Sequence, residues 1–318
     1  ARSVIGIFTA TIGMCSCEAP LLAQRSLGGE IAVSTFASGG LHDPEVAVAV
    51  DGSFFLAWQE SSSGGTQRSG RTYTASGSPR SEPFKVEVDA AGAFTESRPA
   101  ISFDERTDIY RAAWTSYAGL EGRIRVRSRR FSLRGEPLGE ELTVDGNEGG
   151  AFVPALGLSG MSRWLLAWSS GEPNGIDVAS FSQVFDGEIP VTEPLRLNQE
   201  TFGYYSDVRV ATDSLGNSVV VWLASYDRHI QPVVRGQRVS RDGVRVGSEF
   251  GVAAAGAGIQ FLCDVAMDSQ GNFVVAWDQG DPVAEGSTNV YARRFGADGV
   301  ALGEPFRVPS ESAGAQYD

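Results

Sequence analysis

Metal-ligating side chains are scarce in this sequence of 318 residues. It contains two histidines, His42 and His229, and three cysteines, Cys15, Cys17 and Cys263. A zinc site needs three or four Cys or His ligands that converge, and the sequence has neither a CxxC nor an HxxxH spacing to supply them. We therefore expect no metal site and no cofactor, and we expect the thiols to be structural.

Positive charge is also in short supply. Lysine and arginine together number 26, against 39 aspartates and glutamates, which leaves a formal net charge of −13. This field repels nucleic acid and anionic membranes, so we expect no nucleic-acid partner. Low lysine content and abundant acid favour an extracytoplasmic location (secreted, periplasmic or on the cell surface). We expect no membrane span, and the sequence leaves the oligomeric state open.

No stretch of the chain shows sustained helical periodicity, which excludes βαβ crossovers and a parallel sheet. The 39 glycines and 14 prolines suit many short strands joined by tight turns. A length of 318 residues would hold two average domains, but all-β folds often form one unit of this size. The sequence therefore predicts a single all-β domain.

One sequence unit repeats along the chain with a nearly constant period. Its first anchor is a tryptophan that ends an apolar run and recurs at almost equal intervals, at Trp58, Trp114, Trp168, Trp222 and Trp277. Its second anchor is an apolar pair that recurs with the same spacing and begins at Ile31, Phe84, Leu142, Leu195, Phe250 and Phe306. Two independent anchors with one period indicate a structural repeat.

Four strands are legible in the last unit, over 263–267, 273–277, 290–295 and 305–308. Turns rich in Gly, Asp and Asn separate them, for example at 268–272, because these residues accept a positive φ at little cost. A calcium loop would need more oxygen ligands than this turn offers, so we interpret it as a hairpin turn. Four antiparallel strands per unit predict a β-propeller. We favour six four-stranded blades, and seven are compatible with the repeat.

The hydrophobic N-terminus has two interpretations. Residues 4–14 resemble the apolar core of a signal peptide. The same region also aligns with the repeat without a gap, which predicts the second, third and fourth strands of a blade over 4–8, 21–25 and 31–33. We favour the strands. The tail at 311–318 then resembles the lead-in to a first strand, so that both chain ends share one blade and close the ring.

These expectations divide one propeller domain, 1–318, into blades. The shared blade takes residues 1–35 together with the lead-in at 311–318. Five full blades are expected over 36–88, 89–146, 147–199, 200–254 and 255–310.

The best copy of the repeat reads Gly-x-Phe-Val-Val-x-Trp over 271–277, then Arg-x-Phe, Asp-Gly and Phe-x-Val, ending at Val308. In these motifs the chain resembles uncharacterised tandem β-propeller repeats of secreted or surface bacterial proteins. The resemblance implies a propeller fold and an extracytoplasmic setting, and it implies no activity.

One unit is richer than the others in groups that bind ligands. We expect two of its loops to lie on the same face of the propeller. They carry two tyrosines and an aspartate, and then a second polar run: Tyr204, Tyr205, Asp207, Tyr226, Asp227, Arg228 and His229. Aromatic rings, carboxylates and a guanidinium bind sugars or peptide side chains, so these residues are a candidate ligand site. The alternative is an ordinary polar loop with its tyrosines packed on the blade.

The residues that enter the first strand of successive units are mixed in type: Glu45, Arg98, Val153, Asp207 and Leu262. This mixture argues against a symmetric ring of metal or anion ligands on the axis. Catalytic signatures are also lacking, because no nucleophile elbow is present and spacing alone cannot identify a carboxylate pair. We therefore assign no catalytic residue and lean against an enzyme.

Ring closure would bring Cys263 near the loop that carries Cys15 and Cys17. A disulfide from Cys263 to one of these two is therefore a prediction of the six-bladed arrangement. An alternative is that all three thiols are free.

The function that the sequence favours is a non-enzymatic binding or scaffolding propeller. It would present its loops to a protein or glycan partner, for example as an accessory subunit of a surface or envelope assembly. The alternative is a carbohydrate-active propeller, either a lectin or a glycoside hydrolase.

Overall fold

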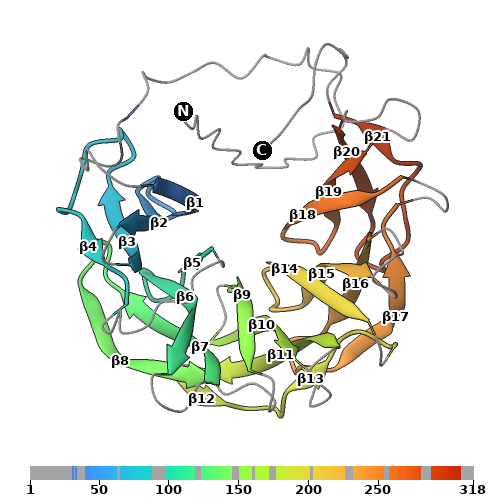
Figure 1. Cartoon of the computed structure of the whole chain (residues 1–318), viewed down its shortest axis with the longest axis horizontal. Coiled ribbons are helices and arrows are strands. Elements are labelled where there is room, and N and C mark those ends of the chain that lie inside the picture. Colours follow the sequence, from blue (N-terminus) through green and yellow to red (C-terminus); the bar gives the residue numbers. More distant parts are fainter. Residues whose placement is uncertain are drawn as a thin grey trace.

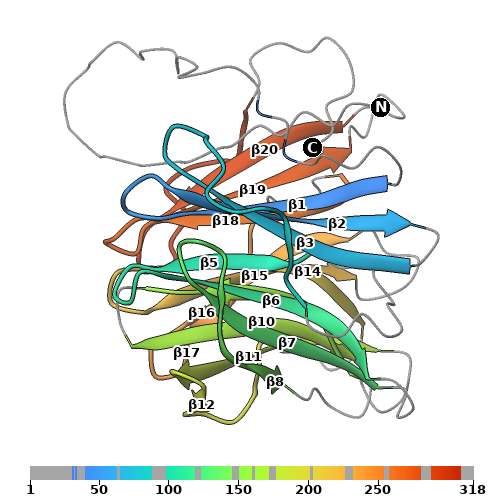
Figure 2. The same ribbon diagram turned by 90° about the vertical axis from the view of Figure 1, so that its left-hand side faces the viewer.

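The apolar runs that end in tryptophan form the second strands of five antiparallel sheets, which stand around a central axis in the computed structural model (Figure 1). The structure describes residues 31, 33, 40–62, 65–87, 98–118, 123–144, 150–159, 162–171, 177–200, 203–225, 232–253, 258–280 and 288–308. In the edge-on view the strands run between the two faces of the ring (Figure 2). The fold is an all-β propeller with repeated blades.

The strands of each blade follow the chain from the channel outward. Blade 1 contains β1 (Gly40–Val48), β2 (Phe54–Ser62), β3 (Gly65–Tyr73) and β4 (Phe84–Lys85). Blade 2 contains β5 (Ala100–Asp104), β6 (Ile109–Ala118), β7 (Arg123–Phe131) and β8 (Pro137–Val144). Blade 3 contains β9 (Ala151–Gly157), β10 (Arg163–Gly171) and β11 (Val178–Asp186), and β11 pairs with both β12 (Ile189–Pro190) and β13 (Leu195–Arg196).

Blade 4 contains β14 (Tyr204–Thr212), β15 (Ser218–Ser225), β16 (Val233–Val239) and β17 (Arg245–Gly251). Blade 5 contains β18 (Gln260–Met267), β19 (Phe273–Gly280), β20 (Thr288–Phe295) and β21 (Phe306–Arg307). No helix long and apolar enough to cross a membrane occurs among the residues that the structure describes.

The predicted number of blades is wrong. The described residues form five blades rather than six or seven, and none of their sheets combines strands from both chain ends, so the predicted ring closure is wrong as well. Ile31 and Val33, expected in the fourth strand of the shared blade, lie in no strand. The Val33 carbonyl instead accepts a hydrogen bond of 3.4 Å from the Tyr73 hydroxyl. The predicted strands at 4–8 and 21–25 lie outside the described residues.

The error has a physical cause. The match between the N-terminus and the repeat used apolar positions and one arginine, Arg25, with Phe8 where every other unit has tryptophan. A short apolar run does not by itself specify a strand that pairs in a sheet.

Four of the repeated tryptophans form the core between blades, whereas Trp58 packs with Leu56 and Tyr73 of its own blade and with Val33. Trp114 packs with Ala47 and Phe55 of blade 1, and Trp222 packs with Ala155 and Leu165 of blade 3. Trp168 and Trp277 face the preceding blade in the same way. Truncation of a side chain this large in a packed core typically costs about 3–5 kcal/mol, so these contacts hold neighbouring blades together.

The apolar pair that forms the second anchor of the repeat lies on the fourth strand, and its first residue packs over a small residue of the third strand. The apolar residue on each fourth strand lies opposite a small residue on the third strand. The pairs are Phe84 with Gly70, Leu142 with Ser128, Leu195 with Ser182, Phe250 with Gly236, and Phe306 with Ala292. A Cβ atom on Gly236 would come within 2.6 Å of the Phe250 ring. This large ring on the outer strand therefore needs a glycine beneath it, because close-packed interiors have no spare volume.

The innermost strands of blades 1, 3, 4 and 5 share one irregularity. Each shifts its register with the second strand opposite the repeated tryptophan. One residue at each shift has a positive φ: Asp43 (52°), Val153 (50°), Asp207 (54°) and Leu262 (26°). A non-glycine residue in this region costs about 1–3 kcal/mol, which the paired strands on both sides must offset. Such β-bulges bend a strand and re-aim its side chains, and these four occur where the strands line the channel.

Candidate functional site

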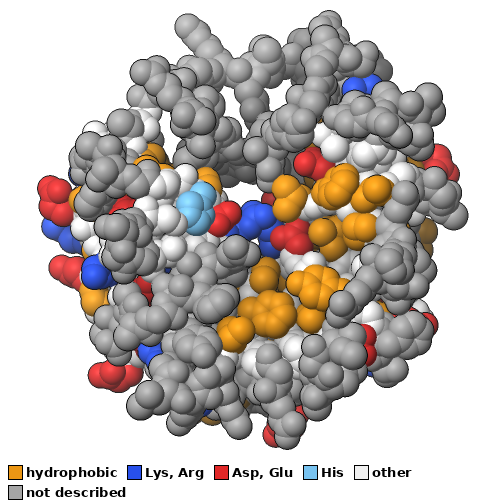
Figure 3. Space-filling view, in the orientation of Figure 1, with side chains coloured by type: hydrophobic (Ala, Val, Ile, Leu, Met, Phe, Trp, Pro, Cys, Tyr) orange, Lys and Arg blue, Asp and Glu red, His pale blue; other side chains and the backbone are white. Residues whose placement is uncertain are grey.

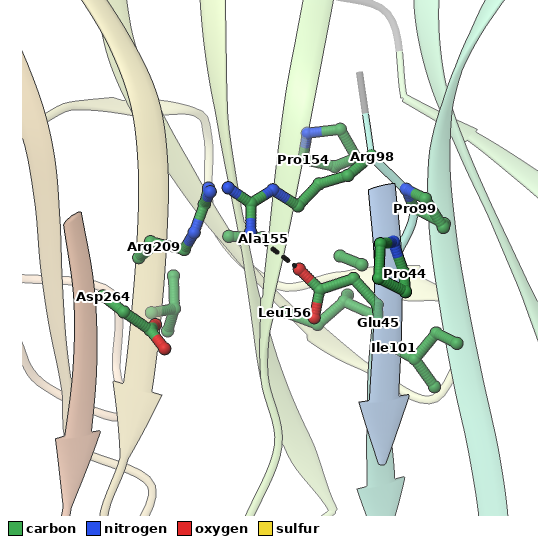
Figure 4. Close-up of a pocket in the computed structure, with 12 residues that line it drawn as sticks. Pro44, Glu45, Arg98, Pro99, Ile101, Pro154, Ala155, Leu156, Arg209 and Asp264 are labelled. Carbon is green, nitrogen blue, oxygen red and sulfur yellow. Dashed lines mark hydrogen bonds and ion pairs between the residues drawn. The ribbon is translucent and has the colours of Figure 1, made fainter. Parts of the chain in front are cut away.

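The residues that follow the bulges meet at a cavity of about 220 Å³ in the centre of the propeller (Figure 4). Prolines from three blades form part of its wall, at Pro44, Pro99 and Pro154. Four charged side chains also line it, together with further apolar residues: Glu45, Arg98, Arg209 and Asp264. A concave site with rigid apolar walls and a few convergent charges is the usual form of a small-molecule or sugar site.

One structural position supplies most of these charges. Pairing with the second strand makes five residues equivalent, one from each blade: Glu45, Ala100, Ala155, Arg209 and Asp264. The position holds a charge in blades 1, 4 and 5 and an alanine in blades 2 and 3. The five equivalent positions therefore give the cavity a charged side and an apolar side.

The same pairing corrects one detail of the sequence alignment. Asp43, rather than Glu45, occupies the place in blade 1 that Asp207 occupies in blade 4, since both lie at the bulge. Asp43, Val153, Asp207 and Leu262 each lie 15 residues before the repeated tryptophan, so the spacing to the tryptophan was the signal that could have found Asp43.

A chain of ion pairs crosses the channel. Arg98 donates a hydrogen bond of 3.3 Å from Nη1 to Glu45 Oε1, and its Nη2 lies 3.8 Å from Asp207 Oδ1. Arg209 Nη2 lies 2.5 Å from the same Asp207 oxygen. Arg98 precedes β5 in blade 2 and Asp207 lies on β14 in blade 4, so the contact joins blades that are not neighbours. Figure 4 shows the Arg98 guanidinium between the Glu45 carboxylate and the Arg209 guanidinium.

Backbone groups form hydrogen bonds with the side chains of these ion pairs. The Cys263 amide donates a 3.1 Å hydrogen bond to Asp207 Oδ2, and Arg209 Nη1 donates one of 2.7 Å to the Val208 carbonyl. Asp207 therefore accepts from a neighbouring blade while two guanidiniums surround it. Both arginines of the cavity already have carboxylate partners.

Burial alters proton affinity at the site. It raises the pKa of Glu45 above its ordinary value of 4.5; Arg98 and Arg209 oppose this effect and the nearby Asp264 carboxylate adds to it. Burial also raises the pKa of the Cys263 thiol well above its usual value, and Asp207 adds to that shift. Burial alone would lower the pKa of Arg209, but Asp207 and other acidic groups outweigh it and raise the pKa. Glu45 is thus a carboxyl group whose pKa is raised by burial and by the nearby Asp264 carboxylate.

The candidate ligand residues from the sequence lie in different places. Asp207 lies in the channel, Tyr204 is half exposed at the start of β14, and Tyr205 is fully buried between blades 3 and 4. Tyr226, Asp227, Arg228 and His229 lie outside the described residues. The Cys263 thiol forms no disulfide with a described residue, and Cys15 and Cys17 lie outside that part of the chain, so the disulfide stays a prediction.

The sequence analysis named Asp207 as a candidate ligand residue and took the mixture of Glu45, Arg98 and Asp207 as evidence against a symmetric ring of ligands, and it missed Arg209 and Asp264. A charged residue two positions after the entry to a first strand was the available signal. Among the described residues, no group of His, Cys, Asp and Glu side chains is placed to hold a metal ion.

The propeller is similar to several solved structures. An α-L-arabinanase from Penicillium chrysogenum in complex with arabinobiose shares 10% identity at a TM-score of 0.59, over 84% of this chain and 80% of that one. An ulvan lyase bound to a glucuronate–rhamnose-sulfate fragment shares 13% identity at a TM-score of 0.58, over 87% and 75%. A protein of unknown function from Dyadobacter fermentans shares 11% identity at a TM-score of 0.57, over 86% and 84%. No family model matches the sequence, and no curated protein matches it.

Likenesses at such low sequence identity show the fold alone. The arabinanase and the ulvan lyase are carbohydrate-active enzymes. The non-enzymatic scaffold that we preferred from the sequence is therefore replaced by its alternative, a carbohydrate-active propeller, which we take up below as a proposal.

Proposed function

We propose that this protein is a carbohydrate-active propeller that binds a glycan at its central cavity and hydrolyses a glycosidic bond there. The observation that carries the proposal is the pair of carboxyl groups at equivalent positions of blades 1 and 5, Glu45 and Asp264, of which Glu45 has a raised pKa. Most glycosidases use two carboxyl groups in different protonation states.

Glu45 is suited to act as the general acid. Its raised pKa favours the protonated form, which is the form that can transfer a proton to the leaving oxygen of a sugar. Asp264 lies in the same cavity and close enough to act on the Glu45 pKa. As the second carboxylate, it would activate water or attack the anomeric carbon.

The remaining charges position this pair. Arg98 holds the Glu45 carboxyl at 3.3 Å and is itself held by Asp207. The prolines of the wall restrict the backbone, because each fixes its own φ. We further propose that the protein works outside the cytoplasm, where polysaccharides are available and where its excess of acid suits it.

Purified protein incubated with arabinan, xylan, mixed-linkage β-glucan and ulvan tests the proposal. We expect binding to at least one polysaccharide and release of new reducing ends. Glu45→Gln and Asp264→Asn should each lower the turnover at least about 100-fold, which general acid–base catalysis typically contributes. Glu105→Gln changes an exposed glutamate in the β5–β6 turn and should leave turnover unchanged.

Thermal unfolding of each variant shows whether the fold is intact. Binding without turnover would contradict hydrolysis and leave a lectin. Absence of binding to every polysaccharide would contradict the proposed function as a whole.

A further inference from the structure

Apolar side chains gather beside the charged cavity, at the mouth of the channel. Tyr204 is 50% exposed at the start of β14, and Phe261 and Leu262 are 40% and 38% exposed at the start of β18. Figure 3 shows apolar side chains next to the central hollow, over β9, β14 and β18, with charged side chains in the hollow itself. Large apolar groups that stay exposed together beside a polar site are typical of ligand contacts.

The bulges place two phenyl rings at equivalent positions. Phe152 and Phe261 each come immediately before the bulged residue of their strand, in blades 3 and 5. The equivalent residue of blade 4 is Ser206, so a small polar side chain lies between two aromatic ones. The Phe261 ring also lies near Gly280 of β19, at 3.7 Å from the position that a Cβ atom would take. A side chain at position 280 would therefore contact this ring.

The charges of the cavity select against acidic sugars. Arg98 and Arg209 both lie in ion pairs with carboxylates, so a uronate or sulfate group would have to displace Glu45 or Asp207 to reach a guanidinium. Asp264 and the net charge of −13 repel such groups as well. A neutral sugar meets neither obstacle, because its hydroxyl groups can donate to these carboxylates.

We infer that Phe261 and Leu262, with Phe152 on the other side of blade 4, form a platform that stacks against a ring of a neutral glycan chain. The chain then runs from the charged cavity across the start of β14, and Tyr204 contacts it from the side. This inference rests on the proposed function and adds the substrate class and the direction of the chain. An aromatic face suits the apolar C–H face of a pyranose or furanose ring, because such a contact buries apolar surface on both sides.

Titration calorimetry with linear arabino-, xylo- and cello-oligosaccharides of two to six units tests the platform. We expect the affinity of the wild-type chain for one series to rise at least tenfold between two and four units. Phe261→Ala should weaken binding of the four-unit sugar about tenfold and change binding of the two-unit sugar less than twofold. Phe306→Ala is the matched control, because this phenylalanine is 46% exposed in the same blade but lies on the outermost strand β21.

The outcomes separate the two proposals. Equal effects of Phe261→Ala and Phe306→Ala, with a neutral glycan still bound and hydrolysed, would overturn the platform and leave the proposed function. Tighter binding of sulfated or uronate-containing ulvan oligosaccharides than of every neutral series would overturn the inferred substrate class. No binding of any oligosaccharide to the wild-type chain would overturn both.

Discussion

Arg98 and Asp207 meet at 3.8 Å across the central channel, although one belongs to the second blade and the other to the fourth. Arg98 also holds Glu45 of the first blade, and Asp207 also holds Arg209. Arginines of blades 2 and 4, which share no sheet and no core cluster, thus both pair with the Asp207 carboxylate.

Removal of Arg98 should therefore destabilise the fold more than removal of an ordinary surface arginine. Arg98→Ala leaves Glu45 and Asp207 with one guanidinium fewer in a site where water reaches them only in part. We expect the free energy of unfolding in urea to fall by about 1–3 kcal/mol. Arg80→Ala breaks the outer pair with Asp51, whose carboxylate is half exposed, and should lower the free energy of unfolding clearly less, because water screens this pair. An equal decrease in the free energy of unfolding for Arg98→Ala and Arg80→Ala would show that the ion pairs of the channel stabilise the fold no more than a surface pair does.

The stability of the fold should depend on pH through Glu45. Its pKa is higher in the folded chain than its ordinary 4.5, so the folded state holds this proton more tightly than the unfolded state does. The contribution of Glu45 to stability is then full below pH 4.5 and declines as the pH rises through the folded pKa. Glu45→Gln lacks this titration. The unfolding free energy of the variant minus that of the wild type should increase with pH above 4.5.

Other groups also make the stability depend on pH, such as Asp268, whose pKa is lowered by hydrogen bonds from Asn272. Subtracting the wild-type value from that of the variant at each pH removes their contribution. The same difference measured for Glu105→Gln should stay flat. A flat difference for Glu45→Gln would mean that the pKa of Glu45 is not raised.

Two of the repeated tryptophans should respond differently to replacement by phenylalanine. Trp58 Nε1 donates a buried hydrogen bond of 2.7 Å to Glu60, whereas Trp222 Nε1 has no hydrogen-bond partner among the described residues. Trp58→Phe leaves the Glu60 carboxylate short of one donor. Trp222→Phe removes a buried donor without a partner. We expect Trp58→Phe to cost about 1–2 kcal/mol more in the free energy of unfolding. The reverse order would contradict this assignment of the two indole groups.

Replacement by alanine should affect stability differently at two glycines of the strands. A Cβ atom on Gly70 would lie 2.5 Å from the Phe55 ring and 3.1 Å from Val86, in the core between blades 1 and 2. Gly70→Ala should lower the free energy of unfolding by about 1–3 kcal/mol, the usual cost of overpacking. A Cβ atom on Gly40 meets nothing closer than 3.9 Å, so Gly40→Ala should stay within about 0.5 kcal/mol of wild type. Thermal unfolding of both variants compares them directly.

The fold could be predicted where the sequence records a packing requirement. Four of the five repeated tryptophans mark a contact between blades, and each Phe or Leu of the fourth strand lies opposite a small residue, so both anchors recur. The number of blades could not be predicted in this way, because residues 4–33 match the repeat in hydrophobicity without its tryptophan. Apolar residues satisfy many kinds of packing.

The site was harder to predict than the fold. Glu45 and Asp264 each lie 13 residues before the repeated tryptophan, so their equivalence could be found from spacing, but the spacing does not show that both side chains face one cavity. The pairing of Arg98 with Asp207 depends on the curvature of the whole ring, since a complete blade separates the two residues along the chain. Long-range contacts of this kind have no local signature.

The repeated bulge also affects how such a site can change over generations. All five blades present a side chain to the cavity from the same strand position, and two of these positions hold only alanine, Ala100 and Ala155. A single codon change at either one would add a new functional group while the tryptophan contacts between blades stay in place. Substitutions at these five positions can therefore change ligand specificity one blade at a time without altering the packing between blades.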